Sequence, residues 1–165
     1  MKIYIVRHAI AEAHGTPGMS DNERPLTAEG IDKMTKAAKG IAKIIEPPPL
    51  ILTSPLERAH HTAKIMAAAL KCEDRIQLED ALMPDVATQA LTRKLAAHKK
   101  LMAIMVVGHE PSLSALAATL LDCSPNVLDI KKGSLMGIEV DTLPFREPGR
   151  LLFFLTPKQL RHIAK

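Results

Sequence analysis

The chain has 165 residues, 47% of them hydrophobic and 24% charged, a composition that excludes a disordered or collagen-like protein and a disulfide-dense scaffold. Aromatic residues make up only 2%, which disfavours a nucleic-acid module that stacks bases on aromatic rings. The net charge of +4 is spread along the chain, so it indicates a solvated surface with, at most, a local site for an anion such as phosphate, and neither a nucleic-acid nor a membrane partner is expected.

The length predicts a single domain over residues 1–165. Cys72 and Cys123 lie far apart, without a CxxC pair or a nearby Cys/His set, which disfavours a zinc site or a redox pair. The spacing alone does not exclude a disulfide between the two cysteines. The first apolar run, residues 3–6, is too short for a signal peptide or a membrane span, so we expect a cytoplasmic protein.

The first half of the chain predicts two strand and helix units. Residues 3–6 form a β-branched apolar run, typical of a strand that is buried on both faces. A polar loop follows, and Thr27 then predicts the start of a helix whose apolar residues recur at helical spacing as far as Ile45, before three prolines. Residues 50–52 predict a second strand, and residues 54–57, Ser-Pro-Leu-Glu, have the pattern of a capping box that opens a second helix.

The second half continues the alternation. The predicted elements are a short edge strand over 76–78, a helix over 86–99, a strand over 102–107, a helix opening at Pro111, two strands over 134–140 and 150–155, and a helical turn over 158–163. Strands that alternate with helices predict an α/β fold, a three-layer α/β/α sandwich around a largely parallel central sheet.

Ligands of such sheets bind where the carboxyl ends of the strands lead into helices. Arg7 and His8 follow the first strand, Arg58 lies in the opening turn of the helix after the second, and His109 follows the strand that ends at Val107. Each residue alone is more simply interpreted as a surface charge or a structural histidine. Together they indicate a phosphate site, because two arginine forks beside a helix N-terminus neutralise a dianion and help to keep an imidazole between them neutral and nucleophilic.

Four segments then carry a family resemblance. They are VRHA at 6–9, RPLT at 24–27 with Gly30, TSP at 53–55 with Arg58 and the TA pair at 62–63, and VGHEP at 107–111. In this order they resemble the motifs of the histidine phosphatase superfamily, in its phosphoglycerate mutase-like branch. The resemblance implies the corresponding phosphoglycerate mutase-like sandwich.

The resemblance also implies a role for each site residue. His8 would accept the phosphoryl group, Arg7 and Arg58 would hold its oxygens, and His109 would donate a hydrogen bond to the same oxygens. Arg24 is a further candidate contact with substrate phosphate. No metal ion or other cofactor is expected.

Two departures from the family pattern bear on the substrate. Ala9 replaces the glycine that follows the nucleophile, as in the short SixA-type phosphohistidine phosphatases, and Ala81 stands where many relatives carry an acidic residue. Glu79, Asp80 and Asp85 are weak candidates for a general acid. The interpretation that they are solvated loop carboxylates is at least as good. A missing acid costs least when the leaving group is an imidazole, which departs readily.

The short segment over residues 79–100 also favours phosphohistidine in a protein, because it has room for only one helix and not for a lid domain. The sequence therefore predicts a metal-independent phosphatase that forms a phosphohistidine intermediate and acts on phosphohistidine in a partner protein. Two alternatives remain: a phosphatase for a small phosphate ester, and a non-catalytic module that binds a phosphorylated ligand. The intact His8 disfavours the second alternative.

Overall fold

The computed structural model describes residues 1–144 and 147–165, and its strands form one central sheet. The order across the sheet is β3, β2, β4, β1, β5, β6. Their bounds are Lys2–Arg7 for β1, Ile51–Thr53 for β2, Ile76–Leu78 for β3, Ala103–Gly108 for β4, Leu135–Glu139 for β5 and Arg150–Leu155 for β6. Strands β1 to β4 pair in parallel, and β5 runs antiparallel to both β1 and β6.

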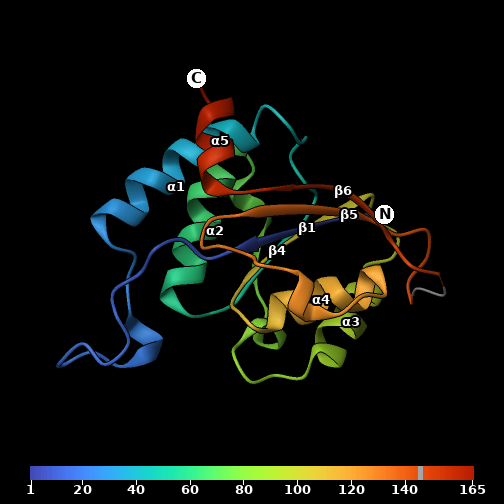
Figure 1. Ribbon diagram of the computed structural model, residues 1–165, viewed down its shortest axis with the longest axis horizontal. Coiled ribbons are helices and arrows are strands. Elements are labelled where there is room, and N and C mark those ends of the chain that lie inside the picture. Colours follow the sequence, from blue (N-terminus) through green and yellow to red (C-terminus); the bar gives the residue numbers. More distant parts are fainter. Residues whose placement is uncertain (145–146) are drawn as a thin grey trace.

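Helices cover both faces of this sheet, which confirms the predicted three-layer α/β sandwich (Figure 1). The helices are α1 (Ala28–Ile41), α2 (Glu57–Leu70), α3 (Thr88–Ala97), α4 (Ser112–Leu121) and α5 (Pro157–Ile163). Residues of α1, α2 and α5 share one hydrophobic cluster with one side of the sheet, and residues of α3 and α4 share a second cluster with the other side. The central strands β1 and β4 are therefore buried from both sides, as their uninterrupted apolar runs predict.

The start of α1 is fixed by residues of the second motif. The side chain of Thr27 accepts a hydrogen bond from the Gly30 amide at 2.9 Å, which confirms Thr27 as the N-cap. A Cβ on Gly30 would lie 2.0 Å from the backbone oxygen of Ile10, so only glycine lets the loop after β1 lie this close to the helix. The loop that follows His8 is thereby held against α1.

Two local predictions are wrong. Helix α1 ends at Ile41 instead of Ile45, because the next residues form a turn that still buries Ile45 in the core, so the apolar periodicity outlasts the helix. Helix α2 has Leu56 as its N-cap without a side-chain hydrogen bond, and Ser54 is not part of a capping box. The Ser54 hydroxyl is instead turned toward His109, as described below.

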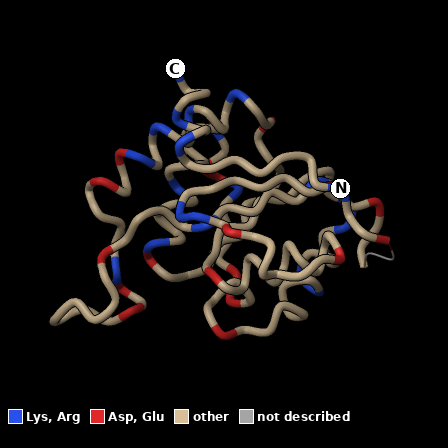
Figure 2. The backbone as a smooth tube through the Cα atoms, viewed as in Figure 1, with Lys and Arg blue, Asp and Glu red and all other residues tan. Residues whose placement is uncertain are grey.

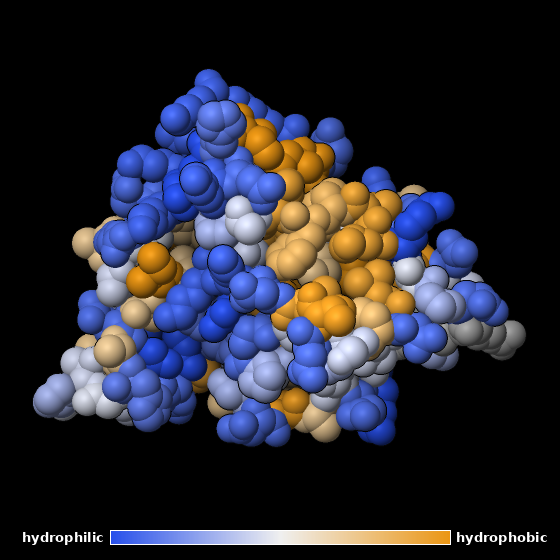
Figure 3. All heavy atoms as spheres, in the orientation of Figure 1, coloured by the Kyte–Doolittle hydropathy of each residue, from blue (hydrophilic) through white to orange (hydrophobic). Residues whose placement is uncertain are grey.

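Three further findings concern the rest of the chain. Cys72 and Cys123 are both free thiols. In the part of the chain that the structure describes, no helix has the length and apolar character needed to cross a membrane. Figure 3 shows hydrophobic residues gathered where β5 and β6 lie, and Leu151 and Leu152 on the edge strand β6 are both exposed.

Candidate active site

The four residues predicted at the carboxyl ends of the strands line one cleft of about 350 Å³. Arg7 ends β1 and His8 follows it, Arg58 lies in the first turn of α2, and His109 follows β4. They meet because β1 and β4 pair in register as far as Arg7 and Gly108, and because β2 ends beside Val107. Arg24 and His14 also line the cleft.

His8 is 6% exposed, and its ring is held in one tautomer. Its Nδ1 lies 2.7 Å from the Ala9 backbone oxygen, and because a carbonyl oxygen only accepts, Nδ1 carries the hydrogen. Burial lowers the pKa of His8 to about 3, and His109, Arg58 and Arg7 add to this shift against the effect of the Ala9 carbonyl. The ring is therefore neutral near pH 7, with an unshared electron pair on Nε2.

The backbone that carries His8 is anchored to α2. The Ala9 amide donates to the Thr62 hydroxyl at 3.0 Å, and that hydroxyl donates to the Arg58 carbonyl at 2.6 Å. Thr62 is fully buried. The threonine of the third motif thus fixes the loop of the nucleophile relative to the helix turn that supplies Arg58.

Arg58 is 3% exposed and is oriented by Asp21, which belongs to a short 3-10 helix over Asp21–Glu23. Its two terminal nitrogens donate to the Asp21 backbone oxygen at 2.7 Å and to the Asp21 carboxylate at 3.0 Å. Arg24 donates to the same carboxylate at 2.7 Å. Although burial opposes it, Arg58 and Arg24 hold the pKa of the Asp21 carboxyl below its ordinary value. Asp21 was not identified from the sequence, because nothing in a polar loop indicates which carboxylate meets the arginines.

Arg7 is fixed from the other side of the cleft, where it donates to the Ile130 backbone oxygen at 2.8 Å. The Nε atoms of Arg7 and Arg58 are buried and have no hydrogen-bond partner in the structure. Buried donors of this kind are rare, since an unpaired polar group costs about 1–3 kcal/mol. Unpaired Nε donors on two arginines that line one cleft, Arg58 buried and Arg7 half-buried, therefore fit the binding of a polyoxygen anion such as phosphate.

His109 is 3% exposed, and its ring centroid lies 5.0 Å from that of His8. Its Nε2 lies 2.9 Å from the Ser54 hydroxyl, which also accepts from the Leu56 amide. The other ring nitrogen, Nδ1, is buried without a partner. Burial lowers the pKa of His109 to about 4, with Arg58 also contributing. His109 is thus a neutral ring that lies beside His8.

The three candidate acids do not line this cleft. Glu79 accepts a hydrogen bond from the Ala81 amide at 3.0 Å and lies 3.4 Å from the Lys94 ammonium, and Asp80 and Asp85 are also absent from its walls. The cleft contains a different carboxyl, that of Glu110. One oxygen of Glu110 accepts from Ser114 at 2.5 Å, and the other is buried without a partner. Glu110 was not identified from the sequence, where its place directly after His109 was the available signal.

Lys132 is a second lining residue that the sequence analysis missed. The Gly133 amide donates to the Arg7 carbonyl at 3.0 Å, which brings the start of β5 to the end of β1. An antiparallel neighbour begins where β1 ends, so the direction of β5 was the signal that would have placed Lys132 here. Among the described residues, no group of three or more His, Cys, Asp or Glu side chains is arranged to hold a metal ion.

Comparisons with known proteins agree with this geometry. Residues 3–83 match the model of the histidine phosphatase superfamily, branch 1. The chain is 31% identical over 141 residues to an uncharacterised protein of Picosynechococcus, with 84% of each chain covered.

Two solved structures share the fold. One is the protein histidine phosphatase SixA complexed with tungstate, with a TM-score of 0.83, 23% identity, and coverage of 97% of this chain and 99% of that chain. The other is phosphoserine phosphatase of Entamoeba histolytica in complex with 3-phosphoglyceric acid, with a TM-score of 0.71, 16% identity, and coverage of 96% and 98%. At these identities the likeness concerns the fold alone.

Proposed function

Because this chain belongs to the histidine phosphatase superfamily, we propose that it removes the phosphoryl group from phosphohistidine in a partner protein by way of a phosphoryl intermediate on His8. The observation that carries this proposal is the fixed tautomer of His8. Its Nδ1 donates to the Ala9 carbonyl, and Nε2 is left unprotonated in a cleft that Arg7 and Arg58 also line.

In the first half of the proposed reaction, Nε2 of His8 attacks phosphorus as the bond to the substrate nitrogen breaks. The substrate imidazole leaves with the bonding electrons, and it departs as a neutral ring if its other nitrogen already carries a hydrogen. The free donors of Arg7, Arg58 and His109 would bind the three phosphoryl oxygens, where charge gathers during transfer. Positioning and charge stabilisation are the main tasks of the protein in such a step.

In the second half, a water molecule attacks phosphorus on the opposite side from Nε2, the phosphorus to Nε2 bond breaks, and inorganic phosphate leaves. The water proton passes to phosphate, and Nε2 regains its electron pair. The hydrogen stays bonded to Nδ1, which donates it to the Ala9 carbonyl throughout, so the ring returns to the form in which it began. Arg7, Arg58 and Lys132 supply the positive charge in the cleft, and the proposed cycle uses no metal ion.

The surroundings of the cleft support a protein substrate. Between Glu79 and Lys100 the structure has only a short 3-10 helix, Asp80–Leu82, and α3, which packs against α4. Of this segment only Pro84 lines the cleft, and in the described part of the chain the segment contains no domain that would cover it. An uncovered cleft admits a phosphorylated side chain that projects from another protein.

One observation favours the second candidate, a phosphatase for small phosphate esters. Glu110 lines the same cleft and one of its carboxylate oxygens has no partner, so a carboxylic acid there could protonate an alkoxide leaving group. Arg24 is the remaining candidate contact for such a substrate, but its guanidinium already donates to Asp21 and to the Glu12 carbonyl.

Turnover across a panel of substrates tests the proposal. The panel holds a phosphohistidine peptide, phosphoramidate, an aryl phosphate and an alkyl phosphate, each assayed with and without EDTA. We expect the first two to be hydrolysed fastest and EDTA to have no effect. Fastest turnover of the alkyl phosphate would favour the ester phosphatase. Binding of the phosphohistidine peptide without any turnover would favour the non-catalytic module.

A further inference from the structure

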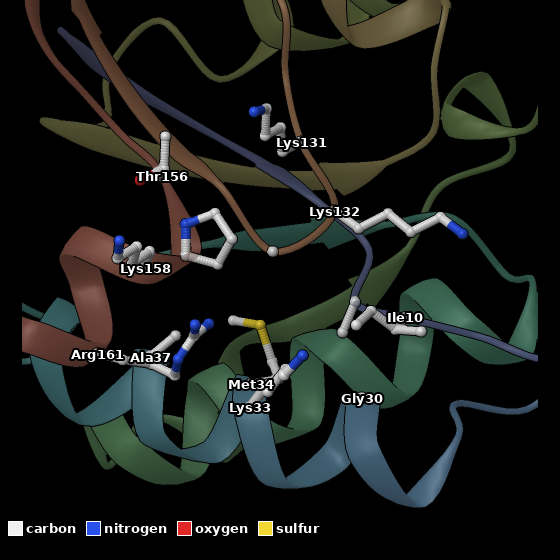
Figure 4. A pocket seen from close by; sticks show the side chains of 13 residues that line it. Ile10, Gly30, Lys33, Met34, Ala37, Lys131, Lys132, Thr156, Lys158 and Arg161 are labelled. Atoms are coloured by element: carbon white, nitrogen blue, oxygen red, sulfur yellow. The ribbon is translucent and has the colours of Figure 1, made fainter.

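A second hollow of about 280 Å³ adjoins the catalytic cleft. It lies between α1, α5 and the loop that leads into β5, and Figure 4 labels the residues that define this α1–α5 groove: Lys33, Met34, Lys131, Lys132, Lys158 and Arg161. Lys132 lines both the groove and the catalytic cleft, and Ala9, the neighbour of His8, lines the groove. A ligand in the groove would therefore lie next to the phosphoryl site.

The groove is strongly basic. Its lining includes four lysines and one arginine and no carboxylate. Lys33 contacts Glu29 on α1, and Lys131 lies 3.9 Å from Asp129. Within the described residues, Lys132, Lys158 and Arg161 form no ion pair. Figure 2 shows Lys and Arg along α5, and both acidic and basic residues along α1. Cations without ion pairs favour the binding of an anionic partner.

The floor of the groove is apolar. Met34 and Ala37 lie beneath the cations, and Pro157 forms one wall. Gly133, with a φ of +79°, leaves space here, because a Cβ at this position would lie 3.5 Å from Met34 Sδ and 3.6 Å from Pro157 Cβ. A small inorganic anion would gain nothing from this floor, and none of the cations above it is buried around such an ion.

We propose that the α1–α5 groove docks an acidic segment of the phosphorylated partner protein, with an apolar side chain over Met34 and carboxylates beside Lys158 and Arg161. The inference rests on the proposed function, since it assigns a binding surface to the substrate protein. Charge complementarity selects the partner, and the shared Lys132 places its acidic segment beside the phosphorylated residue.

Two phosphohistidine peptides of equal length test the proposal. One carries Glu and Leu residues on one side of the phosphohistidine, and the other carries Gln and Ser there. For the acidic peptide, the Lys158→Glu/Arg161→Glu variant should raise KM about tenfold at low ionic strength with little change in kcat, because two attractive charge contacts become repulsive. The Gln and Ser peptide and phosphoramidate should be hydrolysed as by the wild type.

The matched control is Lys99→Glu/Lys100→Glu, which has the same change in charge at exposed residues next to α3, on the other face of the sheet. This variant should leave KM for both peptides within twofold of the wild type. An equal rise in KM for both peptides, or an equal effect of the control variant, would overturn the docking site. A loss of phosphoramidate turnover in the groove variant would assign Lys158 and Arg161 to the catalytic cleft instead.

A binding measurement keeps this test separate from the proposed function. The acidic peptide without phosphate, labelled with fluorescein, should bind the wild type, and fluorescence anisotropy should show binding about tenfold weaker to the groove variant. Binding of this kind in a protein that hydrolyses no phosphohistidine would refute the proposed function and leave the docking surface intact. Equal binding to both proteins would refute docking of an acidic segment.

Discussion

The catalytic cleft and the α1–α5 groove are both basic, and they differ in how their charges are held. In the cleft, Arg58 and His109 are each 3% exposed and are oriented by named partners, Asp21 and Ser54. In the groove, Lys158 is exposed and forms no ion pair within the described residues. Buried groups held in one geometry can stabilise a transition state, whereas exposed cations on flexible side chains are suited to attracting and orienting a partner.

The largest expected effect compares one arginine from each region. Arg58→Ala should lower kcat/KM for phosphoramidate by about 10³-fold, because it removes a charge that bears on the transferring phosphoryl group. Arg161→Ala, which removes an arginine side chain from the groove, should change kcat/KM for phosphoramidate less than threefold. Steady-state kinetics on phosphoramidate measure both. An Arg58→Ala enzyme that loses only substrate affinity, with kcat retained, would place Arg58 in docking rather than in chemistry.

The next effect concerns Glu110 and the leaving group. If Glu110 does not act as an acid, wild-type rates on phosphate monoesters should fall steeply as the leaving group becomes more basic, and Glu110→Gln should change this slope little. Rates on a series of aryl and alkyl phosphates measure the slope. Positioned acids contribute about 10²- to 10⁴-fold, so a flat wild-type profile that becomes steep in Glu110→Gln would identify Glu110 as the acid and favour the ester phosphatase.

The pH dependence of the reaction tests the burial of the two histidines in the cleft. Since burial lowers the pKa of His8 to about 3 and that of His109 to about 4, both rings stay neutral well below the ordinary histidine range. We expect kcat/KM for phosphoramidate, corrected for the ionisation of the substrate, to stay within twofold between pH 8 and pH 5. A fall in rate centred near pH 6.5 would show that one of the two rings titrates like a solvent-exposed histidine.

Stability should change with pH over the same range. The folded pKa of His8 lies below the unfolded value near 6.5, so the unfolded chain binds a proton first and the folded state loses stability as the pH falls from about 6.5 toward 3. At pH 5 this amounts to about 2 kcal/mol for one such ring. Between pH 7 and pH 5 the free energy of unfolding, measured with urea, should fall less in His8→Asn than in the wild type, by about 2 kcal/mol. An equal loss in both proteins would contradict the burial of a neutral His8.

The residues that line the cleft could be predicted from the sequence better than Asp21 and Ser54, which orient them. Arg7, His8 and His109 could be placed because buried apolar strands are easy to identify and the carboxyl ends of parallel strands meet at one edge. Asp21 could not, because its position depends on how a polar loop folds back onto Arg58. Ser54 was assigned to a helix cap because the capping pattern is local, whereas its contact with His109 spans two strands of the sheet.

The groove was not predicted at all. Its residues lie on α1, on α5 and before β5, so no sequence window contains them together. They meet because the antiparallel β5 returns the chain to the end of β1, and α5 then packs beside α1. Apolar periodicity predicts that each helix is buried on one face, and it does not indicate which helices become neighbours.

The transfer of a phosphoryl group to His8 is the central claim, and trapping that intermediate tests it most directly. Enzyme mixed with a ³²P-labelled phosphohistidine peptide and quenched in alkali within milliseconds should carry label that is stable to base and labile to acid, and peptide mapping should assign it to Nε2 of His8. His8→Ala should carry none and should lose turnover. Label on another residue, or near-normal turnover by His8→Ala, would contradict the account.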